Sequence, residues 1–136
     1  MNMSEFVKSC GLSMSAVQIR ARTDRYNQTK EDKKWHDTAS HWHVTLTNKE
    51  GESRSWEYSM GSGHKGEPSM GSVLESLQCD ASGRDGQSFE DWCSEFGYDT
   101  DSKRAEARYT ACGQTVYTLR SLLGRDAYAL LMSVEC

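Results

Sequence analysis

The chain has 136 residues, of which 36% are hydrophobic and 26% charged, and its formal net charge is −4. This length is typical of one domain, and four Trp, six Tyr and three Phe residues supply enough apolar surface to exclude wholesale disorder. No apolar run approaches the ~18 residues that a membrane span needs, which excludes an integral membrane protein. We therefore expect a single domain over residues 1–136.

The charge is unevenly distributed along the chain. Residues 1–66 hold ten Lys and Arg residues against eight Asp and Glu residues, whereas residues 67–136 hold six against twelve. This balance disfavours general nucleic-acid binding, because contacts to phosphates need clustered cations. Two interpretations remain, a solvated surface that keeps the protein monodisperse and an acidic face that docks a basic partner.

Five cysteines are present, none of them in a C-x-x-C pair. The first residues, Met1–Glu5, contain neither the basic nor the apolar region of a secretory signal. We therefore expect a reducing, cytoplasmic setting without a disulfide framework. Cys93 and Cys112 occupy apolar positions of helical patterns, which predicts two thiols in the core.

The first half of the chain predicts an antiparallel sheet within residues 15–60. Residues 1–13 form an N-terminal arm, in which residues 4–8 could make a helical turn. Residues 15–26 alternate, which predicts a half-buried strand with an apolar face that includes Val17 and Ile19. Gln18, Arg20 and Arg22 lie on its other face.

A hairpin is predicted next. Residues 41–47 and 54–60 alternate around a turn at Asn48–Gly51, where the glycine permits a positive φ. One face of this hairpin is apolar and needs a cover. The residues of that face are Trp42, Val44, Leu46, Trp56, Tyr58 and Met60.

Residues 68–136 predict three or four helices. Pro68 suits a first helical turn, Ser88 with Asp91 a capping box that starts at the N-cap Ser88, and Gly97 a left-handed stop. A third helix begins at Asp101 or Ser102. Apolar stripes at helical spacing follow each start, and they comprise Met70, Val73, Leu74 and Leu77, then Phe89, Trp92, Cys93 and Phe96, then Ala105, Tyr109, Cys112, Val116, Leu119 and Leu123.

Two further features complete the helical part. Gly113 interrupts the third helix at a cost of roughly 1 kcal/mol relative to Ala, which indicates close contact with another helix there. The tail from Asp126 to Cys136 predicts a fourth helix, capped by Asp126, rather than a closing strand. The predicted fold class is therefore α+β, with a three-stranded antiparallel sheet and three or four helices packed on one of its faces.

Two patterns suggest ligands but remain incomplete. Gly61–Gly66 with Lys65 could cradle a phosphate. A P-loop, however, needs Gly-Lys followed by Ser or Thr, and here Gly66 is followed by Glu67 and Pro68, so turn geometry explains these glycines better. His41 and His43 could share a metal ion, but no third ligand has a telling spacing. We predict no cofactor and no metal, and assign no catalytic residue.

Five carboxylates crowd the second helix and the loop after it. They favour a solvated helix face or a docking surface for a basic protein over an acid–base active site. Together with the neighbouring aromatic Tyr98, the candidate partner-binding residues are Glu90, Asp91, Glu95, Tyr98, Asp99 and Asp101.

Three segments carry a family resemblance, namely SMGSGHKG at 59–66, FEDWCSEFGYDTDSK at 89–103 and YTAC at 109–112. In these segments the chain resembles small proteins of bacteriophages and prophages, most of which have no assigned function. The resemblance spans residues 40–123 and implies a phage-encoded accessory protein in the host cytoplasm. It supplies no catalytic residue.

The leading functional hypothesis is an anti-CRISPR-like binding protein. It would inhibit a host defence or host machinery component, a protein or ribonucleoprotein, by occluding a basic surface. We expect it to act as a monomer or homodimer away from membranes. A small hydrolase is the least favoured class.

The alternative is a nucleic-acid or nucleotide binder that uses the open face of the sheet. Its candidate residues are Arg20, Arg22, Arg25, His41, His43 and Lys65. The overall negative charge disfavours this alternative.

Overall fold

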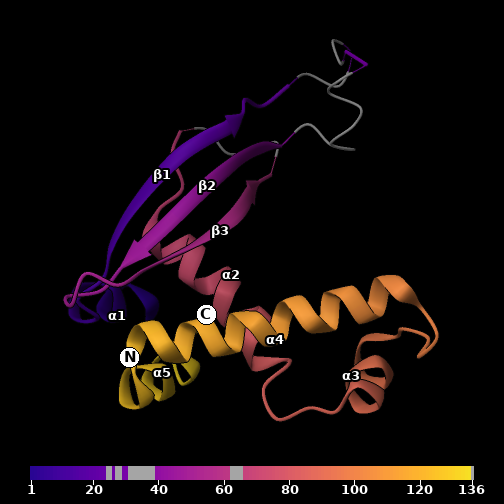
Figure 1. The fold of residues 1–136 in the computed structure, drawn as a ribbon. Coiled ribbons are helices and arrows are strands. Elements are labelled where there is room, and N and C mark those ends of the chain that lie inside the picture. The colour runs from indigo at the N-terminus through magenta and orange to yellow at the C-terminus, as the bar shows by residue number, and fades with distance from the viewer. Residues whose placement is uncertain (24–25, 27–28, 31–38, 62–65, 136) are drawn as a thin grey trace. The chain divides into compact units, whose positions relative to one another are not determined.

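The structure is a computed structural model, and it describes residues 1–23, 26, 29–30, 39–61 and 66–135. The chain divides into two compact units (Figure 1). The sheet unit comprises residues 12–73, and the helical unit comprises residues 1–11 together with 74–136. The described elements, three strands and five helices, confirm the α+β class. None of these helices is both long and apolar enough to cross a membrane.

The sheet unit contains β1 (Ser13–Arg20), β2 (Ser40–Thr47) and β3 (Ser53–Met60) in the order β1-β2-β3. Both neighbouring pairs are antiparallel. The hairpin prediction is confirmed, since Gly51 has a φ of +85° in the turn between β2 and β3. The Asn48 side chain accepts hydrogen bonds from the backbone amides of Glu50 and Glu52 and so holds this turn.

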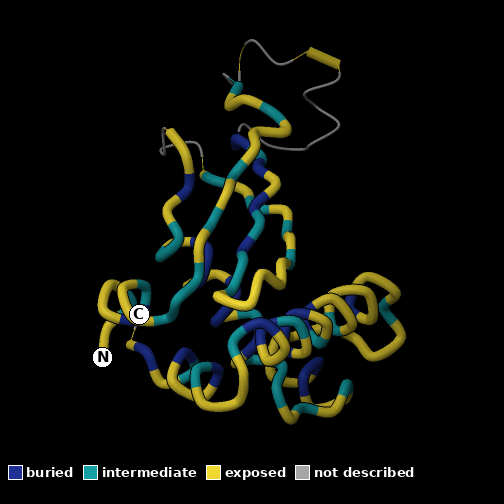
Figure 2. Tube along the Cα trace, turned by 60° about the vertical axis from the view of Figure 1, so that its left-hand side comes forward, coloured by how far each residue is buried: buried dark blue, intermediate teal, exposed yellow. Residues whose placement is uncertain are grey.

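Alternation along β2 separates two faces, as the burial colouring in Figure 2 shows. Trp42, Val44 and Leu46 are buried, as predicted. The opposite face carries hydroxyl groups, because Thr45 lies opposite Ser55 and Thr47 opposite Ser53, with oxygen–oxygen distances of 2.9 and 2.7 Å. This face is therefore polar and internally hydrogen-bonded.

The predicted orientation of the first strand was wrong. Ala16 pairs with the buried Val44, whereas Val17 pairs with His43 on the polar face. Val17 is 64% exposed and Ile19 43% exposed. Apolar residues occur on both faces of this strand, so the pairing with β2 decides which face turns inward. The strand also ends at Arg20, short of the predicted residue 26.

The helical turn predicted at residues 4–8 is confirmed, and it belongs to a longer helix, α1 (Met3–Ser9). Asn2 and Glu5 form a capping box, in which each side chain bonds the other residue's backbone amide. Phe6 is fully buried, which ties α1 into the core of the helical unit. A capped helix that is anchored by one aromatic side chain does not need a longer apolar stripe.

Four more helices follow, α2 (Met70–Ser82), α3 (Phe89–Phe96), α4 (Lys103–Leu123) and α5 (Arg125–Met132). Ser88 caps α3 and Gly97, at φ +76°, ends it, both as predicted. Ser102 rather than Asp101 caps α4. Gly124 precedes α5 without a side-chain cap, so the predicted helical tail is confirmed while its predicted cap at Asp126 is wrong.

Two predicted core positions, Phe96 and Leu123, are corrected within these helices. Phe96 is 49% exposed although it belongs to the predicted stripe of α3. On α4, Thr115 and Leu122 are buried in addition to the predicted residues, and Leu123 is only partly buried. Cys93 and Cys112 are buried thiols, as predicted. The packing of the helices on the sheet and the single domain stay predictions.

Candidate functional site

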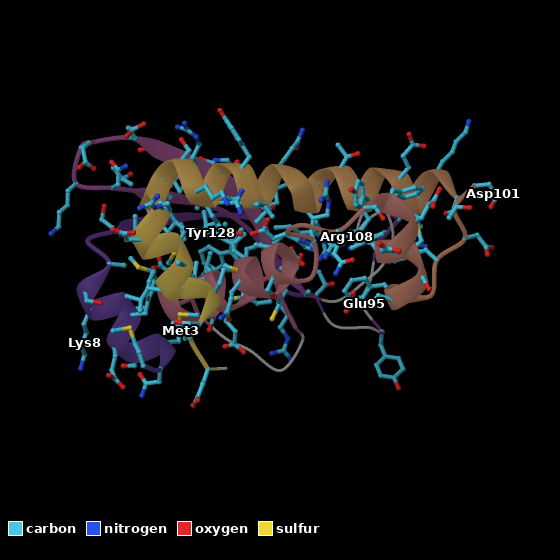
Figure 3. The ribbon with its side chains drawn as sticks, turned by 90° about the horizontal axis from the view of Figure 1, so that it is seen from below. Met3, Lys8, Glu95, Asp101, Arg108 and Tyr128 are labelled. Atoms are coloured by element: carbon cyan, nitrogen blue, oxygen red, sulfur yellow. The ribbon has the colours of Figure 1, made fainter. Side chains whose placement is uncertain are left out.

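The acidic candidates surround α3 in the helical unit. We call them the α3 carboxylates, and they are Glu90, Asp91, Glu95, Asp99 and Asp101. All are exposed, and none has an ion-pair partner among the described residues. No Lys or Arg occurs between residues 88 and 102. The segment therefore presents five uncompensated negative charges, and in Figure 3 Glu95 and Asp101 lie on the same end of the helical unit.

A cavity of about 220 Å³ opens beside this segment, and we call it the aromatic cavity. Three elements build it, namely the C-terminal part of α2, α3 with the residue after its stop, and the first half of α4. Its lining residues are Cys79, Asp80, Gly83, Trp92, Phe96, Tyr98, Arg108 and Cys112. Phe96 and Tyr98 belong to both the acidic segment and the cavity wall, so the two features adjoin.

Trp92 is the centre of the aromatic wall. Its ring is stacked on Tyr98, with centroids 5.0 Å apart and an interplanar angle of 4°, and lies 5.5 Å from the Phe96 ring. Trp92 is buried, whereas Phe96 and Tyr98 are 49% and 39% exposed. The outer rings therefore offer apolar surface to a ligand while Trp92 fixes their positions.

An ion pair supplies the polar part of the cavity. The Arg108 guanidinium on α4 lies 2.8 Å from the Asp80 carboxylate on α2. Cys112 sits one turn further along α4, and burial raises the pKa of its thiol. Burial and the negative charge of Asp99 likewise raise the pKa of Cys93. Both thiols are therefore protonated and poorly nucleophilic near neutral pH, which favours binding over covalent chemistry.

Arg84 supports the aromatic wall of the cavity through Tyr109. Its guanidinium lies 3.5 Å above the centre of the Tyr109 ring and donates hydrogen bonds to the carbonyls of Tyr109 and Gln87. Tyr109 in turn contacts Trp92 edge-on, with centroids 5.6 Å apart. A Cβ at Gly113 would come within 3.0 Å of this guanidinium. The close neighbour of Gly113 is therefore a side chain from the α2–α3 connection and not the predicted neighbouring helix.

The alternative site lies on the polar face of the sheet unit and is only partly described. Arg20 is opposite His41 in the register, and the Ser59 hydroxyl lies 2.8 Å from His41 Nδ1. The Arg20 guanidinium donates hydrogen bonds to the Ala39 carbonyl and the Thr23 hydroxyl. His43 and Arg22 are exposed. Arg25 and Lys65 lie outside the described residues, as does most of the glycine loop.

Metal ligands do not gather in the described ranges. Among those residues, no three His, Cys, Asp or Glu side chains come together as a metal site would require. His41 and His43 share a face of β2, and Ser59 and Glu57 lie opposite them on β3.

Sequence analysis missed half of the cavity lining. Asp80, Gly83 and Arg108 were not singled out, because a charged residue on a helix pattern predicts a solvated face. The sequence holds no signal for the Asp80–Arg108 pair, because the two residues lie 28 positions apart and only the fold brings them together. Tyr98 is the one predicted partner-binding residue that the structure places in the cavity wall.

Comparison with protein families, with curated proteins and with solved structures finds no match for this chain. The site must therefore be interpreted from its own geometry.

Proposed function

We propose that this chain is a binding protein whose α3 region captures a basic protein surface. The observation that supports this most is the juxtaposition of five uncompensated carboxylates with a cavity walled by half-exposed aromatic rings. A charged rim around an aromatic centre is the anatomy of a protein interface. The carboxylates would orient the partner and speed its encounter.

The aromatic cavity would take one anchoring side chain of the partner. Its volume of about 220 Å³ exceeds what a single ring needs, and Phe96 and Tyr98 supply exposed apolar surface. An anchor that is desolvated in such a cavity dominates the binding free energy of an interface.

The resemblance to phage proteins supports the finer form of the proposal. The partner would then be a host defence or host machinery component, and capture of its basic surface would exclude nucleic acid from it. This is an anti-CRISPR-like mode of inhibition that needs no catalytic residue and no cofactor.

Comparative affinity capture tests the proposal. Tagged wild-type protein, a site variant (E90Q/E95Q/D99N) and a matched control (E50Q/E52Q/E57Q) would be incubated with nuclease-treated bacterial lysate. The two variants have the same net charge, so they differ only in where carboxylates are lost. We expect one partner to be retained by the wild type and the control and depleted at least tenfold with the site variant. Equal retention by both variants contradicts the proposal.

The second candidate, nucleic-acid binding on the sheet unit, is supported by the difference in net charge between the sheet unit and the helical unit. Residues 12–73 hold nine Lys and Arg residues against eight Asp and Glu residues, so this unit carries +1. A fluorescent single-stranded oligonucleotide at low salt tests this candidate. Binding that weakens steeply with salt and is lost in Arg22→Gln supports it, and no binding at low salt removes it.

A further inference from the structure

The two edges of the sheet are protected to different degrees. β1 and β3 are the edge strands of the order β1-β2-β3. An edge strand exposes unpaired backbone amides and carbonyls, and proteins usually block such edges with charged residues, prolines or bulges. The β3 edge carries Arg54 and Glu57, two charges of opposite sign within eight residues.

The β1 edge lacks this protection over most of its length. Residues 13–19 are Ser-Met-Ser-Ala-Val-Gln-Ile, with no charge and no proline. The first charged residue is Arg20, and the pairing with β2 is regular until the shift between Gln18 and Arg20. Seven consecutive residues therefore form an uncharged edge.

Exposed apolar side chains mark the same stretch. Val17 is 64% exposed and Ile19 43% exposed, and both are β-branched residues suited to a strand interior. Among the described residues, the backbone of Ser13–Ile19 makes no hydrogen bond outside its pairing with β2. Both the backbone groups and the side chains of this edge are thus available to a further strand.

We infer that β1 pairs with the β1 strand of a second copy of this chain, forming a continuous six-stranded antiparallel sheet. Antiparallel pairing about a two-fold axis sets the same uncharged segment on both sides, so the edge complements itself. The sheet unit has a net charge of +1, so two such units meet with little repulsion, whereas residues of the helical unit carry −5. This distribution favours contact through the sheet unit.

The dimer is expected to be weak. One strand pair with a few flanking side chains buries less than the ~1,200 Å² that separates stable from transient interfaces. The inference does not depend on the proposed function of α3, because the strand and the α3 carboxylates belong to different units.

Sedimentation velocity of the full chain under reducing conditions tests this inference. Wild-type protein, from low micromolar to near-millimolar concentration, should show a dimer fraction that rises with concentration. Val17→Lys places a charge on the β1 edge and should abolish the dimer. Ser55→Lys adds the same charge to the β3 edge and should leave the dimer intact.

Amide hydrogen exchange of the wild type provides a readout that needs no variant. Exchange at residues 13–19 should slow as concentration rises, while exchange on β3 should not change. If Val17→Lys unfolds the protein, Ile19→Lys replaces it. A wild type that stays monomeric at every concentration overturns the inference, as does a dimer lost equally in the β1 and β3 variants.

Discussion

The helical unit and the sheet unit are held together in different ways. The sheet unit relies on a regular ladder of strand pairs, in which each residue contributes a small part. The helical unit holds most of the buried apolar side chains, and in addition a few polar side chains each join two or more of its segments. These are Gln78 between α2 and the end of α5, Arg84 between the α2–α3 connection and α4, and Asp85 with Arg120 and Tyr128.

The difference indicates where this protein is sensitive to substitution. A ladder loses little when one side chain changes, whereas a buried polar side chain that is removed leaves its partners without hydrogen bonds. The unit that carries the candidate site is therefore the more fragile one. The following experiments test this contrast, beginning with the largest expected effect.

Arg84→Met is expected to cause the largest fall in the free energy of unfolding. It removes a charged hydrogen-bond donor to two carbonyls and a guanidinium above the Tyr109 ring, so the free energy of unfolding should fall by about 2–3 kcal/mol. Arg104→Met, at an exposed position of helix α4, is the control and should change the free energy of unfolding by less than ~0.5 kcal/mol. Equal effects in urea denaturation would contradict the positioning role of Arg84.

Gln78→Leu is expected to lower the free energy of unfolding by about 2 kcal/mol, because it removes the side-chain donor to the Leu131 and Val134 carbonyls. The Leu131 carbonyl still accepts from the Val134 amide, so the main loss is at Val134. Each of these oxygens lies 2.8 Å from the Gln78 amide nitrogen. Gln114→Leu, at an exposed position on α4, is the matched control. A Gln78→Leu protein as stable as this control would show that the α2–α5 contact contributes nothing.

Tyr128 predicts a loss of stability at high pH. Burial and a 2.9 Å hydrogen bond to Asp85 raise the pKa of Tyr128 from 10.0 to about 12. Between these two pH values the folded state therefore keeps the Tyr128 proton, whereas the unfolded state has lost it. The contribution of this group to the free energy of unfolding is complete below pH 10 and disappears as the pH rises to 12. Between pH 9 and 12 the midpoint temperature of thermal unfolding should fall more steeply for the wild type than for Tyr128→Phe. Parallel pH dependences of the two proteins would refute the raised pKa of Tyr128.

The smallest effect is expected in the sheet. Thr45→Val removes a hydroxyl from the 2.9 Å contact with Ser55 but keeps the branched shape of the side chain on an antiparallel strand. The free energy of unfolding should change by less than ~0.5 kcal/mol. A loss above 2 kcal/mol would contradict the contrast between the two units.

Local patterns predicted much of the fold. Asn48–Gly51 and the alternation beside it specify the hairpin, because turn chemistry and side-chain period are properties of neighbouring residues. Ser88 and Gly97 specify the ends of α3 for the same reason. What depends on partners distant in sequence was missed.

Two examples show this limit. Both faces of β1 carry apolar residues, and only the register against β2 turns Ala16 inward and Val17 outward. Arg84 follows a helix end in a glycine-containing segment, a context typical of solvated residues, although Gly113 was a sign that something lies close to α4. The aromatic cavity was therefore not predicted, and the partner-binding role of the neighbouring α3 carboxylates stays a prediction.

A titration of isotopically labelled protein with an arginine-rich peptide, followed by amide chemical shifts, tests the central claim most directly. If the α3 region is a docking surface for basic protein, residues 88–102 and the Trp92 indole should shift first and saturate together. The exposed carboxylates Glu50 and Glu57 of the sheet unit should shift only weakly. Shifts of equal size at all exposed carboxylates, or shifts confined to the sheet unit, would contradict the account.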